Sequence, residues 1–508
     1  PVSNLASSIQ GKVSGVLVTS PSGTPGAGLL VSVRGAHNPL YVVDGVPMIS
    51  ESNSALSTAY DTNGDEQGSG QNLSSISEIN PDDIESIEIL KDASSASIYG
   101  ARAANGVVLV TTKRGRAGKT EFSFNSHTGI QQVSRKIPFL DSKGFTALVE
   151  DARKQDLIAY QRDPTPFNDA YPGFDPAVLT NPLPSSWSTG VNTNWLNEVF
   201  HPAPVSSIQL SARGGNDKTK FFLGGSYFDQ QGIVIENYYK RASFRMNLDN
   251  KVSDRVTIGA NTSFTFGKNH RSFNDDTYTG VVTNAIGASP LMPVYNADGS
   301  YADYTQYQAT WLSDNPVKSA HEVKAFSTNY RFIGTVFTDV NIIKDLKFRT
   351  SFSTDYSNLV DDQFFSPITS DGAPVGGKAL AGTYRSLTWL NENILTYSHA
   401  AGKSSINALC SRPSRSSMIS AISAGRNLLS ASRVAVVRTT PPLSASDATL
   451  AQSMTLSTPG VLPIAPGKIR RIKDRKDTST PTNRISLSSG ARYRSEVRTT
   501  RKPFTSTI

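Results

Sequence analysis

The sequence predicts a small α+β domain at the N-terminus, followed by an antiparallel transmembrane β-barrel that is incomplete, with about nine strands. Three observations predict this fold class. Residues 86–112 have the pattern of a strand, a short helix and a second strand. Polar and apolar residues alternate with a period of two after the N-terminal domain, and long connections between the strands alternate with short ones.

A helix start opens the central part of the N-terminal domain. Asn80 supplies a side-chain cap, and Pro81 occupies the first helical position, where its missing N–H is not needed. Asp82 and Asp83 follow in the first turn, where the helix dipole favours negative charge. Because adjacent helical residues do not face one another, we expect this pair to serve the helix start rather than acid–base chemistry.

Two strands flank a second short helix in the same domain. Residues 86–90 (SIEIL) predict the first strand, Asp92 caps a helix through Ala96, and Gly100 is its stop. Residues 107–112 (VVLVTT) are β-branched and almost wholly apolar, which is typical of a strand buried on both faces.

The first residues predict further strands. Residues 13–19 and 29–34 have strand patterns separated by a Ser/Pro/Gly loop. Residues 40–43 (LYVV) meet Asp44-Gly45, a dipeptide that readily adopts positive φ at both turn positions, so we expect a hairpin. Residues 51–71 are rich in Gly, Ser and Asn and predict an exposed loop.

Beyond residue 120 the alternation is that of half-buried strands of about ten residues. Phe264 and Phe266, for example, alternate with Ser263 and Thr265. The predicted strands are 121–131, 205–213, 218–228, 240–249, 256–267, 326–340, 346–357, 385–398 and one that starts at 404.

The connections between these strands favour a barrel over a soluble sandwich. Long segments such as 132–204, 268–325 and 358–384 alternate with short ones such as 214–217 and 341–345. A transmembrane barrel has short turns at one end and long loops at the other, whereas a sandwich has no reason to keep this difference.

Composition agrees with strands rather than helices as membrane spans. The chain has 508 residues, of which 37% are hydrophobic, and a mean hydropathy of −0.29. No run approaches the roughly 18 apolar residues that a transmembrane helix needs. Barrel strands alternate lipid-facing and lumen-facing residues, so their mean hydropathy stays low.

The C-terminal tail differs from the rest of the chain. Residues 401–508 contain 18 Lys and Arg against four Asp and Glu, a net charge of +14, so the first 400 residues carry −6 of the total +8. The tail holds only two of the 44 aromatic residues, Tyr493 and Phe504. We hypothesise that the reading frame shifts near Leu409, with a disordered natural tail and an Arg-rich nucleic-acid patch as alternatives.

The segments LKDASSASIYGARAANGVVLVTTKRG at 90–115 and PLYVVDGVPM at 39–48 carry a family resemblance. They closely resemble the plug domain of the SusC/RagA family of TonB-dependent outer-membrane transporters. The resemblance implies a plug domain at 1–118, the first part of the barrel at 119–409 and an aberrant tail, frameshifted or disordered, at 410–508. The motif residues, expected to be structural, are Arg34, Gly35, Tyr41, Asp44, Gly45, Lys91, Asp92, Tyr99, Gly100, Arg102, Asn105 and Gly106.

What the resemblance implies for function is import across the outer membrane of a Bacteroidetes-type bacterium. Members of this family pair with a SusD-like surface lipoprotein, draw energy through the TonB complex, and take up glycans or other oligomers such as peptides. Arg34, Arg102 and Lys113 are candidates for ion pairs with acidic residues of the barrel lumen. Two alternatives remain open: a surface receptor module that does not transport, and a nonfunctional truncated gene product.

Substrate is expected on the long loops and the outer face of the plug. Flat aromatic faces complement the apolar faces of sugar rings, although anchoring of the loops is the competing role for each residue. The candidates are Trp187, Trp195, Tyr301, Tyr304, Tyr307 and Trp311.

The sequence predicts neither an enzyme nor a metal or cofactor site. The six histidines are scattered, and the single cysteine, Cys410, excludes a Cys-based zinc site. Asp361 and Asp362 are adjacent and are expected in a solvated loop. No nucleic-acid partner is expected, because the basic tail lacks aromatic residues for base stacking. No signal peptide precedes the first strands, so we expect the sequence to begin inside a longer protein.

Overall fold

The computed structural model describes residues 9–19, 23–27, 29–48, 79–92, 97–170, 173–188, 190–272, 280–304, 314–401, 404–427 and 433–440. All of them lie in the first of the chain's two compact units, Pro1–Ala448.

The N-terminal domain contains two small sheets. A three-stranded sheet has the order β1 (Val16–Thr19), β2 (Leu30–Val33) and β3 (Ala36–His37). A four-stranded sheet has the order β5 (Val46–Met48), β4 (Leu40–Val43), β7 (Val107–Thr112) and β6 (Ile84–Leu90). Strand β7 pairs parallel to β4 and antiparallel to β6, so it lies in the interior of its sheet. The prediction of burial on both faces holds for Val107 and Val108, which are fully buried, whereas Thr111 is exposed.

Two tight turns shape this domain. Asp44 and Gly45 have φ of 48° and 90° between the paired residues Val43 and Val46, which confirms the predicted hairpin. Arg34 and Gly35 repeat this conformation, with φ of 51° and 85°, between β2 and β3.

Short 3₁₀ helices replace the predicted helices of this domain. The first, η2 (Pro81–Asp83), starts with the Asn80 side chain accepting from the Asp82 N–H, as predicted. The second, η3 (Ser97–Ala103), continues past Gly100, which lies at a kink with φ of 67°. The predicted helix at residues 93–96 and the whole of the loop 51–71 fall outside the described residues.

The core of the domain joins both sheets. It includes Val18 and Val31 from the three-stranded sheet together with Tyr41, Met48 and Val108 from the four-stranded sheet, all less than 9% exposed. The two sheets therefore form one folded unit.

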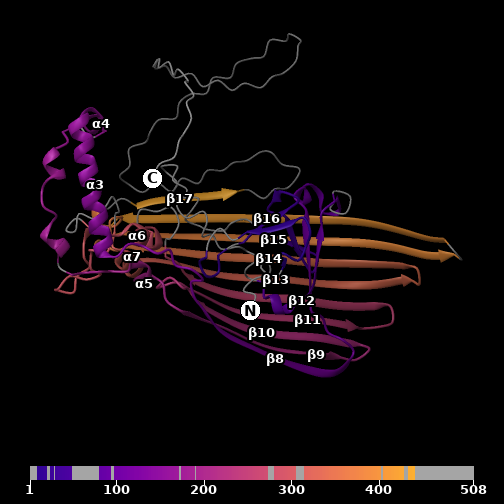
Figure 1. Ribbon diagram of the computed structural model, residues 1–508. Coiled ribbons are helices and arrows are strands. Elements are labelled where there is room, and N and C mark those ends of the chain that lie inside the picture. The colour runs from indigo at the N-terminus through magenta and orange to yellow at the C-terminus, as the bar shows by residue number, and fades with distance from the viewer. Residues whose placement is uncertain are drawn as a thin grey trace, which may run out of the picture. The chain divides into compact units, whose positions relative to one another are not determined.

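A ten-stranded antiparallel sheet, which we call the wall, follows the N-terminal domain (Figure 1). Its strands pair in sequence order, with β8 and β17 at the two ends within the described residues. The strands are β8 (Gly118–Gln131), β9 (Ala203–Gly215), β10 (Thr219–Gln231), β11 (Tyr238–Lys251), β12 (Val256–His270), β13 (Val323–Ile343), β14 (Leu346–Phe365), β15 (Lys378–Ala401), β16 (Ser404–Asn427) and β17 (Arg433–Thr440).

Each of the nine predicted strands corresponds to one strand of the wall, but the wall extends beyond the boundary predicted at Leu409. Strand β16 continues to Asn427 in register with β15, from Leu395 opposite Cys410 to Lys378 opposite Asn427, and β17 pairs with it. The pairing uses main-chain N–H and C=O groups, so the loss of side-chain alternation does not by itself end a strand. Residues 441–508 of the predicted tail fall outside the described residues.

The two faces of the wall differ in polarity, in the opposite sense to a soluble sheet. Large apolar side chains such as Phe264, Phe332 and Phe352 are exposed, while their polar neighbours such as Thr265 and Arg331 are buried. Further exposed apolar residues are Ile208, Leu210, Leu223, Tyr227, Phe244, Leu248, Ile258, Tyr330, Val336, Tyr356, Leu387 and Leu395. Further buried polar residues are Gln209, Arg245, Asn247, Asn261, Asn269, Ser327, Asn329, Thr335, Ser351, Ser353, Asp355, Ser357, Asp361 and Thr388.

Asp361 corrects one expectation. Because β14 runs to Phe365, Asp361 lies within a strand and faces the polar side, where its carboxylate accepts from the Ser327 hydroxyl at 2.5 Å. It is 1% exposed rather than part of a solvated loop.

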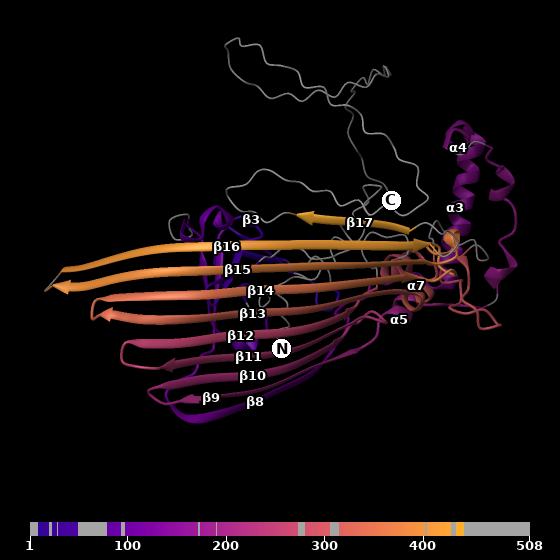
Figure 2. The same cartoon turned by 180° about the vertical axis from the view of Figure 1, so that it is seen from behind.

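The long connections gather at one end of the wall, as predicted (Figures 1 and 2). They carry helices α3 (Ser142–Arg162), α4 (Thr165–Ala170), α5 (Trp195–Val199), α6 (Val281–Gly287) and α7 (Pro316–Glu322). They also carry 3₁₀ helices η4 (Pro176–Leu179), η5 (Ser185–Ser188) and η7 (Ala373–Val375). None of the helices in the described part of the chain is both long and apolar enough to cross a membrane.

Candidate functional site

The N-terminal domain is joined to the wall by a buried ion pair at the Asp-Gly turn. The Asp44 carboxylate accepts from the Thr112 backbone N–H at 3.0 Å and from the Thr112 hydroxyl at 2.5 Å. Arg245 of β11 pairs with the same carboxylate and also donates to the Thr112 hydroxyl. The side chains of Arg245 and Asp44 are only 6% and 5% exposed. One carboxylate therefore links β4, β7 and the wall.

A second carboxylate, Asp83, contacts the wall beside this pair. The Gln209 amide of β9 donates to Asp83 at 3.0 Å, and both residues are buried. Burial raises the pKa of the Asp83 carboxyl above its usual range, although the Arg245 guanidinium and the Gln209 hydrogen bond oppose this shift. The sequence assigned Asp83 only to a helix start, so its wall contact was missed.

Backbone groups of the N-terminal domain supply further attachments. Asn247 of β11 donates to the Lys113 carbonyl at 2.6 Å, and Asn269 of β12 donates to the Pro25 carbonyl at 3.0 Å. Gly115 lies so close to β10 that a Cβ at this position would collide with the backbone of Phe221. These contacts are polar or involve the main chain, and they tie the domain to the polar face of the wall.

A small pocket of about 20 Å³, lined by both polar and apolar side chains, lies along this junction. It is lined by Asp44, Asn80 and Asp83 from the N-terminal domain and by residues such as Arg245 and Asn261 from the wall. Asn80 Nδ2, Arg245 Nε and Asn261 Oδ1 are buried there and form no hydrogen bond with the described residues. Because buried polar groups without a protein partner are usually satisfied by water, we expect this junction to be hydrated.

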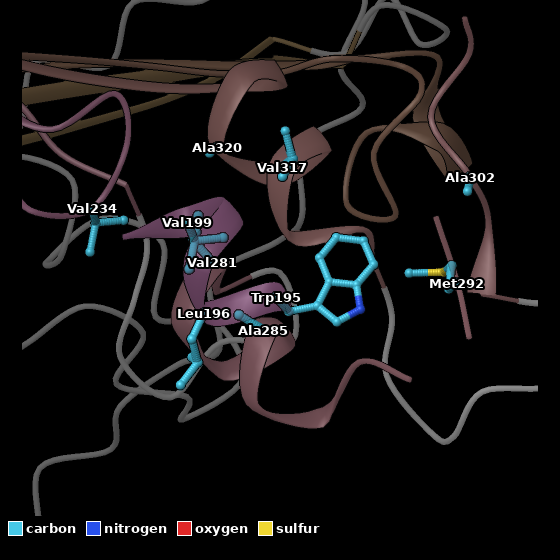
Figure 3. Close-up of a cluster of buried hydrophobic side chains, with 10 residues drawn as sticks. All are labelled: Trp195, Leu196, Val199, Val234, Val281, Ala285, Met292, Ala302, Val317 and Ala320. Carbon is cyan, nitrogen blue, oxygen red and sulfur yellow. The ribbon is translucent and has the colours of Figure 1, made fainter. Parts of the chain in front are cut away.

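Among the connections between the wall strands, three share one apolar core, which we call the loop core (Figure 3). Helix α5 from the β8–β9 connection packs against α6 and α7 from the β12–β13 connection. Val234, from the β10–β11 turn, completes the cluster. The members are Trp195, Leu196, Val199, Val234, Val281, Ala285, Met292, Ala302, Val317 and Ala320.

Trp195 corrects the predicted substrate set. Its side chain is 3% exposed within the loop core, and its indole N–H donates to the Ser289 carbonyl at 2.8 Å. A ring covered on both faces cannot stack on a ligand, so Trp195 has the anchoring role that was the competing interpretation.

The other candidates occupy different positions. Trp187 is half-buried in η5, with its ring 5.8 Å from that of Phe145 in α3. Tyr301 and Tyr304 are partly exposed and pack on the edge of the loop core. The predicted residues Tyr307 and Trp311 fall outside the described residues.

Sequence reasoning missed Tyr295. Its ring lies 5.3 Å from that of Tyr301, with an interplanar angle of 33°, and it is 49% exposed. The signal in the sequence was the spacing of two tyrosines around the turn Asn296–Ser300, which we did not identify as a hairpin. Among the described residues, no group of three His, Cys, Asp or Glu side chains is placed to hold a metal ion.

Comparison with known proteins places this geometry in a family. Residues 1–107 match the model of the TonB-dependent receptor plug domain. TonB-dependent receptor P26 of Formosa agariphila is 32% identical over 421 residues, which cover 79% of this chain and 37% of that protein. TonB-dependent receptor SusC of Bacteroides thetaiotaomicron is 26% identical over 392 residues, covering 72% of this chain and 34% of that receptor.

The chain is related to the SusC/RagA-type TonB-dependent receptors. The structure of the RagAB peptide transporter has the same fold, with a TM-score of 0.66 and 24% identity over 86% of this chain and 50% of that chain. The chain thus spans little more than a third of the length of the curated relatives and half of the RagAB chain.

The sequence predicted that basic residues of the plug domain pair with acidic residues of the barrel, and the structure shows a different arrangement. Arg34 pairs within the plug with Asp92 at 2.8 Å, Arg102 is exposed, and Lys113 contacts the wall through its carbonyl. The buried pair has the opposite polarity, because the acid, Asp44, lies on the plug and the base, Arg245, on the wall. The residues around Arg245 in β11 do not indicate that its partner is Asp44, which lies 201 residues away in the sequence.

The remaining motif residues hold the plug together. Lys91 donates to the Ser14 carbonyl and Asn105 donates to the His37 carbonyl at 2.8 Å, linking η3 and β6 to the three-stranded sheet. Tyr41 is 1% exposed in the core, and Tyr99 packs beside Leu40 and Val107. Gly106 has φ of 89° and lies against Val33.

Proposed function

We propose that this chain forms the plug and the first wall strands of an outer-membrane importer that takes up oligosaccharides or other oligomeric nutrients such as peptides. It works with a SusD-like surface lipoprotein and is driven by the TonB complex. The observation that carries the proposal is the sheet with an exposed apolar face and a buried polar face, to which a plug domain is tied.

The polarity of the wall supports placement in a lipid bilayer. Exposed residues such as Phe264 and Phe332 match the apolar band that a barrel presents to lipid, and the polar face matches a lumen. In a soluble sheet the same apolar side chains would be covered by a second layer.

The plug attachments support a gate that force can rearrange. Asp44, Asp83 and the carbonyls of Pro25 and Lys113 meet polar wall residues. When such contacts separate, water replaces each partner, whereas an apolar interface would lose its burial. A pull transmitted to the plug through TonB therefore opens a path at modest cost.

The import proposal is tested by deleting the coding segment in the bacterium that carries it. We expect loss of growth on one class of oligosaccharide or peptide as sole carbon source, with normal growth on the corresponding monomers as the control. A tagged chain isolated from outer membranes in detergent is expected to recover a SusD-like lipoprotein.

Other outcomes assign the chain differently. Unchanged growth on every oligomer, with ligand binding retained, would favour a receptor that does not transport. Unchanged growth together with no chain in the outer membrane would favour a nonfunctional gene product.

Placement in the membrane gives a separate prediction. Phe264→Arg, in the middle of β12, is expected to destabilise the inserted sheet by about 2–4 kcal/mol, because the charge would lie near the bilayer midplane. The measurement is urea unfolding in lipid vesicles. The matched control is Ile258→Arg, on the same face but near the short-turn end, where the expected cost is about 0–1 kcal/mol. Equal costs at the two positions would argue against a bilayer around this face.

A further inference from the structure

We infer that the hairpin Val294–Ala302 is a stacking site for an uncharged sugar ring, with Tyr295 as its principal contact. The inference rests on the proposed function and adds to it the substrate class and the residue. It is carried by three features of the hairpin: a fixed backbone, an exposed pair of rings, and acidic charge.

The backbone of the hairpin is closed by its own hydrogen bonds. The Ala302 N–H donates to the Val294 carbonyl at 3.2 Å, and the Asn296 N–H donates to the Ser300 carbonyl at 2.8 Å. Tyr295 and Tyr301 face each other across an antiparallel bridge, which places both side chains on one side of the hairpin. The ring pair is therefore set by the backbone.

The hairpin is also fixed to the loop core. The Asn315 amide donates to the Val294 carbonyl at 2.9 Å and to the Ala302 carbonyl at 3.2 Å. Ala302 is buried in the loop core, and Val294 and Tyr301 pack against it. A ligand that binds here pays little to order the protein, because the platform is already held.

The rings leave an aromatic face available. Tyr301 packs on the loop core and on Tyr295, whereas Tyr295 remains 49% exposed. Trp195, the largest ring of the loop core, is 3% exposed and is therefore not accessible to a ligand. Tyr295 is thus the side chain of the pair that a flat ligand reaches first.

The charges around the platform select against acidic ligands. Within the hairpin, residues 294–302, the one charged side chain is that of Asp298. The Asp298 carboxylate accepts from the Ser300 N–H at 2.9 Å and from its hydroxyl at 2.6 Å, and these hydrogen bonds hold its pKa below the usual range. Glu236, an electrostatic neighbour of Tyr301, is paired with Lys324 at 3.1 Å and with His321, so the acidic charge of the hairpin is that of Asp298.

The test is direct binding to the full chain purified in detergent, measured by calorimetry. The probes are maltohexaose, cellohexaose and mannohexaose as neutral ligands and hexagalacturonate as the acidic one. We expect at least one neutral hexaose to bind more tightly than hexagalacturonate. Tyr295→Ala is expected to weaken that binding by about two- to tenfold, the range of one aromatic contact.

Matched variants separate stacking from structure. Tyr295→Phe keeps the flat ring and is expected to bind within about twofold of the wild type, whereas Tyr295→Leu keeps bulk without a flat face and is expected to behave as Tyr295→Ala. Tyr227→Ala, which removes an exposed ring from the apolar face of β10, is the control and is expected to change nothing.

Three results would overturn the inference: no neutral hexaose binds, hexagalacturonate binds most tightly, or Tyr295→Ala binds as the wild type does. Import of peptides in the growth experiment would then leave the proposed function standing. Conversely, Tyr295-dependent binding without any uptake would keep this site and remove the import proposal.

Discussion

Asp44→Ala is expected to destabilise the attachment of the plug to the wall by about 3–5 kcal/mol, because it leaves the Arg245 guanidinium buried without its directly paired carboxylate. The same substitution removes two acceptors from Thr112, so β4 and β7 lose a link as well. Hydrogen exchange followed by mass spectrometry on the chain in detergent is expected to show faster exchange in β4 and β7.

The plug itself offers the matched control. Arg34 and Asp92 form an ion pair of 2.8 Å with side chains 57% and 65% exposed, so Arg34→Ala is expected to cost about 0–1 kcal/mol. The double variant Asp44→Leu with Arg245→Met removes both charges together and is expected to recover much of the loss. If Asp44→Ala and Arg34→Ala have the same effect, the buried pair is not what fastens the plug.

Trp195→Ala is expected to lower the stability of the loop core by about 3–5 kcal/mol, the range for removing a buried aromatic side chain. The reason is a cavity at the contact of α5 with α6 and α7, together with the loss of the hydrogen bond to the Ser289 carbonyl. Limited proteolysis is expected to cut the β12–β13 connection sooner, since α6 and α7 lose their shared support.

Trp187 provides a control of the same residue type in the same connection. It is half-buried and packs on Phe145, outside the loop core, so Trp187→Ala is expected to leave cleavage of the β12–β13 connection unchanged. Equal cleavage in the two variants would show that the burial of Trp195 does not hold the three connections together.

Short stretches of sequence were enough to predict many of the strands and turns of this protein. The alternation around Phe264 and Thr265 placed a strand and its two faces correctly, and the Asp44-Gly45 dipeptide placed a hairpin. Each of these features depends on a residue and its nearest neighbours, through side-chain period and allowed φ, so a short window contains the information. The long and short connections then gave the two ends of the wall.

Contacts between residues far apart in the sequence could not be predicted from local patterns. Asp83 contacts Gln209 at a separation of 126 residues, and Asp44 contacts Arg245 at a separation of 201 residues. The register of four wall strands and the docking of the plug bring these residues together. Neither carboxylate carries a local mark of its burial.

The loops show the same division. Trp187 and Trp195 lie in one connection, and composition alone treated them alike as candidate ligand contacts. One ring is buried by helices from another connection, whereas Tyr295, which was not singled out, is 49% exposed. Exposure is a property of everything packed around a side chain, so it is fixed only when distant segments meet.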